Sequence, residues 1–393
     1  MDSLMQMKTE ATVLHAKFSE RYDREPCVLR VTRNADVNQP DRHALLSTEK
    51  QANSVAFGAT LSYQWNLSTS VPMRFTLPDA FGYLDEGDIL RISPRSGDVW
   101  VMYRVNARTH SVFVTERCNS WCVMCSQPPK PRDSVNLADA WEQAIPFMDP
   151  LTPELGFTGG EPTLLGDRFI KLLTLARDCL PKAAIHVLSN GRLFAYLSFA
   201  EAVASVKHND LIVGIPLYSD IGWRHDHVVQ APHSFDQTVR GILNLARVGV
   251  AVEIRVVLHR LTLERLLELA QFIARNFPFA AHVALMGYEP IGFGRTNLRS
   301  LWVDPVEYHE PLKRAVQWLV QQGIAVSIYN HQRCILPESL WPFAVKSISD
   351  WKNIYLPICE GCEARQDCGG FFHSAVDAHS AHIKPLQVHS LLS

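Results

Sequence analysis

Residues 111–125, SVFVTERCNSWCVMC, decide how the middle of this chain folds. The first five residues are an apolar, β-branched run, which predicts a buried strand. Three cysteines follow with the spacing C-x3-C-x2-C, at Cys118, Cys122 and Cys125. They are therefore expected in the loop at the carboxyl end of a strand, where the active sites of parallel α/β barrels gather.

Downstream of this segment, short apolar runs alternate with longer amphipathic ones. Six strand candidates are SVFVT, LGFTGG, AIHVLSNG, LIVGIPLY, AVEIRVVLH and AHVALMG, and helix candidates such as DRFIKLLTLARDCL separate them. This alternation predicts a parallel sheet with right-handed crossovers and helices on its outer face. Six units are too few to close an eight-unit barrel. The prediction for residues 109–300 is therefore a partial (β/α)6 barrel.

Two further regions flank the predicted barrel. Residues 1–108 are expected to form a β-rich domain, because FGYLDEGDILRISPRSGDVWVMYRV has the pattern of strand, turn and strand. Residues 301–393 begin with a helix, VDPVEYHEPLKRAVQWLVQQG, and a strand, IAVSIYN, before a loop-rich tail with the last four cysteines. The whole chain is thus expected to be an α/β protein in three parts.

Composition argues against several classes of function. The 393 residues include 38 Lys plus Arg and 40 Asp plus Glu, a net charge of −2, which argues against broad nucleic-acid binding. No apolar run reaches the length of about eighteen residues that a membrane span needs. The N-terminus lacks the apolar core of a signal peptide. We therefore expect a cytoplasmic protein with no membrane or nucleic-acid partner.

Seven of the nine cysteines fall into two groups, which in a reducing compartment are more often metal ligands than disulfides. In the first group, Cys118, Cys122 and Cys125 are one thiolate short of the four that close a 4Fe–4S site, which leaves one iron open. The alternative is a three-cysteine zinc site with an unidentified fourth ligand. Cys27 and Cys179 stand alone and are expected to be small hydrophobic residues.

A second motif, Gly159-Gly160-Glu161-Pro162, ends the next predicted strand. Adjacent glycines let a ligand approach the backbone closely. Glu161 can accept a hydrogen bond from an ammonium group, and Pro162 stiffens the exit from the strand. Alone, the motif is compatible with an ordinary strand-to-helix turn, but its position one strand after the cysteine triplet favours a functional role.

The two motifs together resemble the radical S-adenosylmethionine (radical SAM) superfamily, over about residues 110–295. The resemblance implies a partial (β/α)6 barrel with a 4Fe–4S cluster on the three cysteines. It also implies that S-adenosylmethionine is chelated at the open iron and that its amino group is bound by the strip from Gly159 to Pro162. Reductive cleavage of S-adenosylmethionine would then give a 5′-deoxyadenosyl radical, which abstracts hydrogen from the substrate.

The same resemblance implies roles for residues near other strand ends. Ser189 and Asn190, in SNG after the third strand, would lie near the ribose, although an Asn-Gly turn explains them equally. Met124 stands where the family usually has an aromatic residue near the adenine, and a thioether can pack against a ring. Met286 on the sixth strand and Arg255 on the fifth are candidates for an adenine contact and a carboxylate contact.

Three histidines, His225, His227 and His233, occur in GWRHDHVVQAPHS after the fourth strand. The spacing H-x-H can bind a metal, but the segment supplies no clear cage of carboxylates. Solvated loop histidines are therefore the expectation.

The second cysteine group, Cys334, Cys359, Cys362 and Cys368, has the spacing C-x24-C-x2-C-x5-C. Four thiolates with a C-x2-C core can close a zinc site or a fully ligated iron–sulfur cluster, and the spacing leaves both open. Attached to a barrel of this family, the group resembles the twitch or SPASM extensions. That resemblance implies an auxiliary 4Fe–4S cluster.

Four short stretches narrow the resemblance: CSQPP at 125–129, LWP at 340–342, SISDWKN at 347–353 and CGGFF at 368–372. They resemble the His-Xaa-Ser system radical SAM maturases, in particular the C-type component. The implied substrate is a ribosomally made polypeptide with His-Xaa-Ser repeats, and the implied partners are a second radical SAM maturase and a reducing electron donor. The alternatives are a radical SAM enzyme acting on a small molecule and a zinc-stabilised, non-catalytic binding protein.

Overall fold

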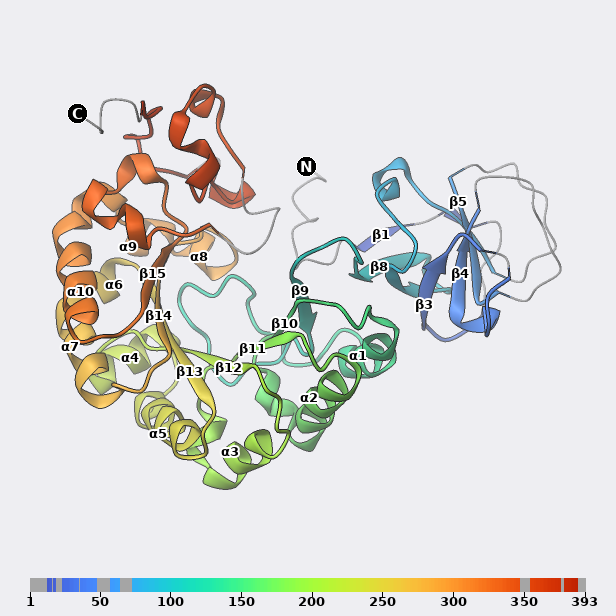
Figure 1. The fold of residues 1–393 in the computed structure, drawn as a ribbon, viewed down its shortest axis with the longest axis horizontal. Helices are drawn as coiled ribbons and strands as arrows, with labels where there is room; N and C mark the ends of the chain where they lie inside the picture. Colours follow the sequence, from blue (N-terminus) through green and yellow to red (C-terminus); the bar gives the residue numbers. More distant parts are fainter. Residues whose placement is uncertain are drawn as a thin grey trace.

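The computed structural model describes residues 13–15, 17–18, 23–34, 36–47, 57–63, 73–346, 354–375 and 378–387. Within them the chain forms two sheets and a C-terminal segment of short helices and loops. Figure 1 shows the helix-covered parallel sheet, with the N-terminal sheet and the C-terminal segment beside its two ends. Among the described residues, no helix is both long and apolar enough to cross a membrane.

The parallel sheet has seven strands in the order β15-β14-β13-β12-β11-β10-β9. They are β9 (His110–Phe113), β10 (Glu154–Thr158), β11 (Ala184–Leu188), β12 (Leu211–Pro216), β13 (Ala251–Leu258), β14 (His282–Gly287) and β15 (Val326–Tyr329). All six strands predicted for the barrel are present. The strand predicted after residue 301 is β15, which pairs with β14 and extends the sheet past the predicted boundary at residue 300. The division at residues 108 and 300 stays a prediction.

Helices follow the strands in turn and cover the convex face of the parallel sheet (Figure 1). The helices α1 (Leu137–Ala144), α2 (Asp167–Cys179), α3 (Leu197–Ala204), α5 (Ser234–Arg247), α7 (Leu266–Asn276) and α10 (His309–Gln321) pack on the strands in one continuous apolar core, as right-handed crossovers predict. The helices near the strand ends are α4 (Gly222–Val229), α6 (Arg260–Leu263), α8 (Phe293–Thr296) and α9 (Leu298–Leu301).

The two faces of the parallel sheet differ in burial. Along β10 and β11, half-buried residues alternate with fully buried ones. The fully buried residues, such as Phe157 and Ile185, belong to the core beneath the helices. Parallel sheets are usually buried on both faces, so the half-buried positions indicate an accessible concave face. We call the space on that face the lumen; side chains that face it include His186, Glu253 and His282.

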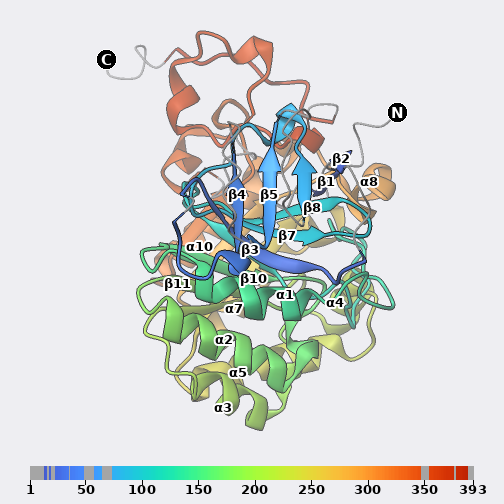
Figure 2. The same ribbon diagram turned by 90° about the vertical axis from the view of Figure 1, so that its right-hand side faces the viewer.

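The N-terminal sheet has eight strands in the order β1-β8-β7-β3-β4-β5-β6-β2. They are β1 (Val13–His15), β2 (Lys17–Phe18), β3 (Cys27–Thr32), β4 (His43–Leu46), β5 (Ala59–Ser62), β6 (Arg74–Thr76), β7 (Ile89–Ser93) and β8 (Asp98–Tyr103). The predicted strand, turn and strand are β7 and β8, which pair antiparallel. Figure 2 views the molecule with this sheet toward the reader.

The N-terminal sheet and the barrel share a packed interface. Trp100 of β8 makes an edge-on contact with Trp141 of α1, with ring centroids 5.8 Å apart. Tyr103 stacks on His110 at 4.3 Å, and its hydroxyl lies 3.0 Å from the hydroxyl of Thr152. Trp100, Tyr103 and Trp141 belong to the core of the barrel, so the N-terminal sheet is fixed against the first strand and helix.

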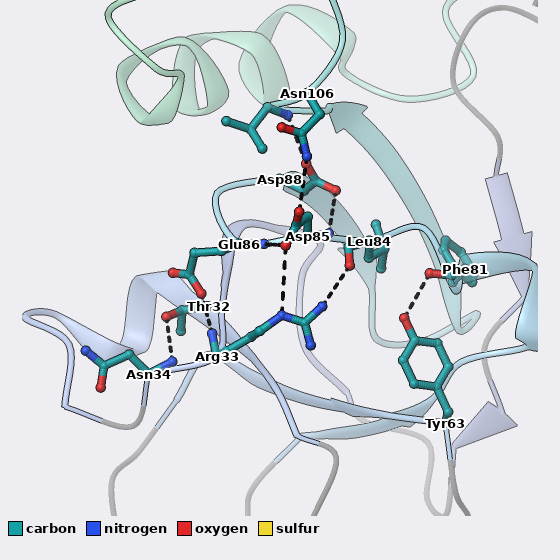
Figure 3. Close-up of polar contacts among 11 residues, drawn as sticks. Thr32, Arg33, Asn34, Tyr63, Phe81, Leu84, Asp85, Glu86, Asp88 and Asn106 are labelled. Atoms are coloured by element: carbon teal, nitrogen blue, oxygen red, sulfur yellow. Dashed lines mark hydrogen bonds and ion pairs between the residues drawn. The ribbon is translucent and has the colours of Figure 1, made fainter.

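A buried carboxylate fastens the chain where it leaves the N-terminal sheet (Figure 3). Asp88 is 1% exposed and accepts hydrogen bonds from the backbone N–H groups of Asp85 and Val105, each at 2.9 Å. Nearby, the guanidinium of Arg33 donates to the carbonyl of Leu84 at 3.1 Å. Burial raises the pKa of Asp88 above its ordinary value, and the two N–H donors offset part of that effect.

The substitution Asp88→Asn is expected to lower the free energy of unfolding by about 1–3 kcal/mol, because an amide cannot accept from both backbone donors. Denaturant unfolding at pH 7 measures the change. The control is Asp79→Asn, at an exposed position, which is expected to leave the midpoint unchanged. Equal effects of the two substitutions would contradict a stabilising role for the Asp88 contacts.

Candidate functional site

The cysteine triplet lies in the loop that leaves β9 at the carboxyl end of the sheet. Cys118, Cys122 and Cys125 are partly buried free thiols. Burial raises the pKa of all three, and the charges of Glu161 and of neighbouring thiols also raise it for Cys118 and Cys122. Together these effects bring the pKa of Cys118 to about 11. The thiols are therefore close enough to disfavour one another's ionisation. A positively charged metal group would reverse that effect.

Contacts with distant segments hold the cysteine loop in place. The backbone N–H of Trp121 donates to the carbonyl of Val229 at 2.9 Å, at the end of α4. The N–H of Phe293, in α8, donates to the carbonyl of Cys125 at 2.8 Å. The loop is thus fixed between segments that follow β12 and β14.

Met124 packs under this loop. Its side chain is 7% exposed and belongs to an apolar cluster with Tyr218, Val228, Val229, Ala231 and Leu301. The structure therefore gives this methionine a packing role, and its expected contact with an adenine ring stays a prediction.

The two glycines of the GGEP motif make room for a neighbouring backbone. A Cβ atom at Gly159 would lie 2.5 Å from the carbonyl oxygen of Thr115, and one at Gly160 would lie 2.2 Å from that of Arg117. The N–H groups of Gly160 and Glu161 donate to the same two carbonyls at 2.7 and 2.8 Å. Where a Cβ atom would stand, the two glycines therefore contact the backbone of Thr115 and Arg117, which leads into the cysteine loop. The sequence had predicted a ligand beside these glycines.

Glu161 is a carboxylate that is only 1% exposed. It accepts hydrogen bonds from the N–H and hydroxyl of Thr163, the hydroxyl of Ser189 at 2.8 Å and the N–H of Asn190 at 2.6 Å. Burial raises its pKa in spite of these donors. Among the described residues, no Lys, Arg or His forms an ion pair with it. Such a carboxylate favours a cationic ligand.

Asn190 links Glu161 to the cysteine loop. Its side-chain amide donates to the side-chain oxygen of Asn119 at 2.6 Å and lies 4.0 Å from the sulfur of Cys118. The guanidinium of Arg192 donates to the backbone carbonyl of Asn119. The loops after β9, β10 and β11 therefore form one hydrogen-bonded unit that brings the predicted residues of all three motifs together.

Residues 112–273 match the family model of the radical SAM superfamily. This stretch is a radical SAM domain. The chain thus carries the domain of a radical SAM enzyme, whose family uses a 4Fe–4S cluster and S-adenosylmethionine. The residues of the site fit both groups, since three thiols stand ready as iron ligands and the Glu161 carboxylate lacks a cationic partner among the described residues.

Solved structures that match part of the chain include Streptococcus suis SuiB bound to the precursor peptide SuiA, with 14% identity, a TM-score of 0.46 and coverage of 58% of this chain and 50% of that one. SuiB bound to S-adenosylmethionine has 16% identity and a TM-score of 0.48, and the match covers 65% of this chain and 56% of that one. Native anSMEcpe with bound AdoMet and Kp18Cys peptide has 18% identity and a TM-score of 0.44, and the match covers 56% of this chain and 63% of that one. The chain thus spans about half the length of the SuiB chains. No curated protein matches it in sequence.

A polar network in the lumen of the radical SAM domain escaped sequence reasoning. The Nδ1 and Nε2 atoms of His282 lie 2.9 Å from the carboxylate of Glu253 and 2.9 Å from the hydroxyl of Ser327. Arg255 donates to the other carboxylate oxygen at 2.6 Å, and His186 lies 3.4 Å from that oxygen. Burial acts to raise the pKa of Glu253, but the nearby His186, the hydrogen bond with His282 and the charge of Arg255 hold it below its ordinary value.

Two of the weaker sequence candidates belong to this network. Arg255, expected as a carboxylate partner, pairs with the chain's own Glu253, and its second terminal nitrogen lies 3.2 Å from the sulfur of Met286. Gly214 of β12 leaves space for the network, since a Cβ there would lie 2.9 Å from both Arg255 Cδ and His186 Nε2. The signal available in the sequence was the run of charged residues at alternate positions of β13.

The four C-terminal cysteines also come together. Cys334, Cys359, Cys362 and Cys368 line one pocket, although 24 residues separate the first two. Burial raises the pKa of Cys334 and Cys359, as do the charges of other cysteines of the group. Iron–sulfur and zinc centres both use such thiols. In the described part of the chain, no three Cys, His, Asp or Glu side chains converge on a single-ion site.

His225 corrects an expectation. Sequence reasoning placed it in a solvated loop, but it lies in α4 and is 1% exposed, with its ring 5.8 Å from the rings of Tyr218 and Phe235. The helix forms because Val228 and Val229, one turn further on, bury the same face. His227 also lies in α4 and not in a loop, but both it and His233 are exposed, as expected.

The stretch SISDWKN at 347–353 lies outside the described residues. Trp341, in the stretch LWP, donates its indole N–H to the carbonyl of Arg333 at 3.0 Å. This hydrogen bond therefore stabilises the turn that carries Cys334.

Gly160→Ala is expected to destabilise the domain by about 1–3 kcal/mol and to prevent iron from staying on the first three cysteines, because the added Cβ overlaps the Arg117 carbonyl. Denaturant unfolding and iron content after reconstitution measure the two effects. The control is Gly156→Ala on the preceding strand, where the nearest atom to a Cβ is 3.7 Å away. Similar iron content in both variants would contradict the close-packing argument.

Glu253→Gln is expected to lower the free energy of unfolding at pH 7 by about 1–3 kcal/mol, because it leaves Arg255 and His282 without their carboxylate. The ionised carboxylate stabilises the fold above the ordinary glutamate pKa of 4.5, and this contribution is lost as the pH falls through the lower pKa of the folded state. The gap between wild type and variant should therefore narrow below pH 4.5. Glu201→Gln, at an exposed position, is the control; a gap that is constant with pH would refute the argument.

Proposed function

We propose that this chain is a radical SAM enzyme that modifies a ribosomally made peptide. The observation that carries the catalytic part is the conjunction of three clustered thiols with the buried Glu161 carboxylate, joined by the hydrogen bonds of Asn190. Both lie at the carboxyl ends of parallel strands, the edge where barrel enzymes place their catalytic groups.

Cys118, Cys122 and Cys125 would hold the catalytic 4Fe–4S cluster, which with S-adenosylmethionine supplies the 5′-deoxyadenosyl radical that abstracts hydrogen from the substrate. Glu161, oriented by Ser189 and Asn190, would accept the ammonium group of S-adenosylmethionine. The ammonium would provide the cation that this buried carboxylate lacks among the described residues.

Further contacts to S-adenosylmethionine are proposed for neighbouring residues. Gly159, Gly160 and Pro162 would line the strip beside its amino group, and Asn190 would approach the ribose. Met124 would present its thioether toward the adenine from the apolar cluster under the cysteine loop.

For the second cysteine group we propose an auxiliary 4Fe–4S cluster, held by Cys334, Cys359, Cys362 and Cys368. The proposal is supported by the common pocket of the four side chains and by a sequence pattern like that of the twitch and SPASM extensions. Zinc is the alternative, and metal analysis separates the two.

For the substrate we propose a polypeptide with His-Xaa-Ser repeats, modified in the cytoplasm together with a second radical SAM maturase and a reducing electron donor. The support is the set of sequence stretches around the cysteines, CSQPP, LWP, SISDWKN and CGGFF. In the proposed division, residues 1–108 serve as a docking module, 109–300 as the radical SAM domain and 301–393 as the auxiliary-cluster region.

Anaerobic reconstitution of the full chain tests this function. We expect about eight iron atoms and a similar amount of sulfide per chain, and formation of 5′-deoxyadenosine from S-adenosylmethionine under reducing conditions. Replacing Cys118, Cys122 and Cys125 by Ala is expected to leave about four irons and to abolish the product. Replacing Cys27 and Cys179, the two isolated cysteines, is the matched control and should change neither quantity.

Bound zinc without 5′-deoxyadenosine would refute the enzymatic proposal. Cleavage of S-adenosylmethionine that a His-Xaa-Ser peptide neither stimulates nor couples to a mass change of the peptide would refute the proposed substrate alone.

A further inference from the structure

Residues 383–387, which we call the strap, run along the pocket of the C-terminal cysteines. Lys384 and Leu386 line that pocket together with the four cysteines. The backbone N–H of Leu386 donates to the sulfur of Cys362 at 3.2 Å. The backbone of Lys384 lies beside Cys334, where it acts to lower the pKa of that thiol. Two of the four sulfurs thus have the backbone of one tripeptide next to them.

The sequence of the strap limits the number of its backbone N–H donors. Pro385 lies between the two donor residues and has no backbone N–H. The stretch from Lys384 to Leu386 therefore has two backbone N–H groups, one that donates to Cys362 and one in the residue beside Cys334.

The strap is held in place from both sides. Ile383 is 8% exposed and packs with Ile335 and Phe371 in a small apolar cluster next to Cys334 and Cys359. The carbonyl of Leu386 accepts from the N–H of Glu363 at 3.0 Å, one residue after Cys362. The two N–H groups are therefore oriented by the fold itself.

Hydrogen bonds to cysteine sulfur stabilise negative charge there and help to set the reduction potential of an iron–sulfur cluster. We propose that the strap positions and tunes a 4Fe–4S centre on the four C-terminal cysteines, and that the N–H groups of Lys384 and Leu386 raise its affinity for an electron. The inference rests on the proposed auxiliary cluster. Arg365 and Lys384 are among the residues that line the pocket, and their positive charges act in the same direction.

The test compares Leu386→Pro, which removes one donor, with Leu386→Ala, which shortens the side chain and keeps the N–H. Both are made in the full chain with Cys118, Cys122 and Cys125 replaced by Ala, so that the C-terminal centre is observed by itself. After anaerobic reconstitution, iron, sulfide and zinc are counted, and the centre is titrated with reductant and followed by electron paramagnetic resonance.

We expect Leu386→Pro to shift the midpoint to a more negative potential than Leu386→Ala. A hydrogen bond to a charged group corresponds to about a tenfold change in the ratio of reduced to oxidised centre at a fixed potential. Lys384→Pro, which removes the N–H group beside Cys334, is expected to shift the midpoint in the same direction. Loss of iron from the proline variants but not from Leu386→Ala would also support the positioning role.

Two outcomes overturn the inference in distinguishable ways. Zinc, or no metal, in the Leu386→Ala protein would remove the proposed auxiliary cluster and with it the role of the strap. Iron and sulfide in all variants with equal midpoints would leave the auxiliary cluster in place and refute the strap as its tuning element.

Discussion

The carboxylate of Glu161 is the contact on which the candidate site depends. Burying a carboxylate is costly unless hydrogen bonds or a cation offset the loss of water. Here donors from Thr163, Ser189 and Asn190 offset part of it. Because Asn190 also contacts the cysteine loop through Asn119, the same carboxylate that favours a cationic ligand fixes the positions of the thiols. Ligand binding and loop geometry are therefore coupled through one side chain.

The half-barrel supports this site by separating two kinds of surface along each strand. Outward positions such as Phe157 and Ile185 are fully buried in the core beneath the helices. Lumen positions carry the polar network of Glu253, Arg255 and His282. A closed eight-strand barrel fills its interior with apolar side chains, whereas an open sheet of seven strands leaves room for polar groups that balance one another's charge.

Local patterns predicted much of this fold. The six barrel strands follow from short apolar runs separated by amphipathic segments, and β7 and β8 from a turn flanked by β-branched residues. Both cysteine groups were also evident, because candidate metal ligands are marked by residue type and spacing. Which metal each group would hold was inferred from the family resemblance, not from the geometry, and stays a proposal.

Features that depend on distant segments could not be predicted in the same way. The lumen network joins Glu253, His282 and Ser327 from three strands, and nothing in any one strand shows the other two. His225 was misjudged because polar neighbours hid the apolar helix face that Val228 and Val229 provide. The glycines at 159 and 160 were expected to let a ligand approach the backbone, whereas the group that lies against them in the structure is the chain's own backbone from Thr115 to Arg117.

The two cysteine groups occupy equivalent positions in the topology. Cys118 comes five residues after the end of β9 at Phe113, and Cys334 comes five residues after the end of β15 at Tyr329. These are the two edge strands of one parallel sheet, so the chain leaves both at the same edge. The lumen therefore lies between the loop that carries Cys118 and the loop that carries Cys334. A sheet that stops short of closure thus lets Cys118 and Cys334 follow the carboxyl ends of two strands that lie at its opposite sides.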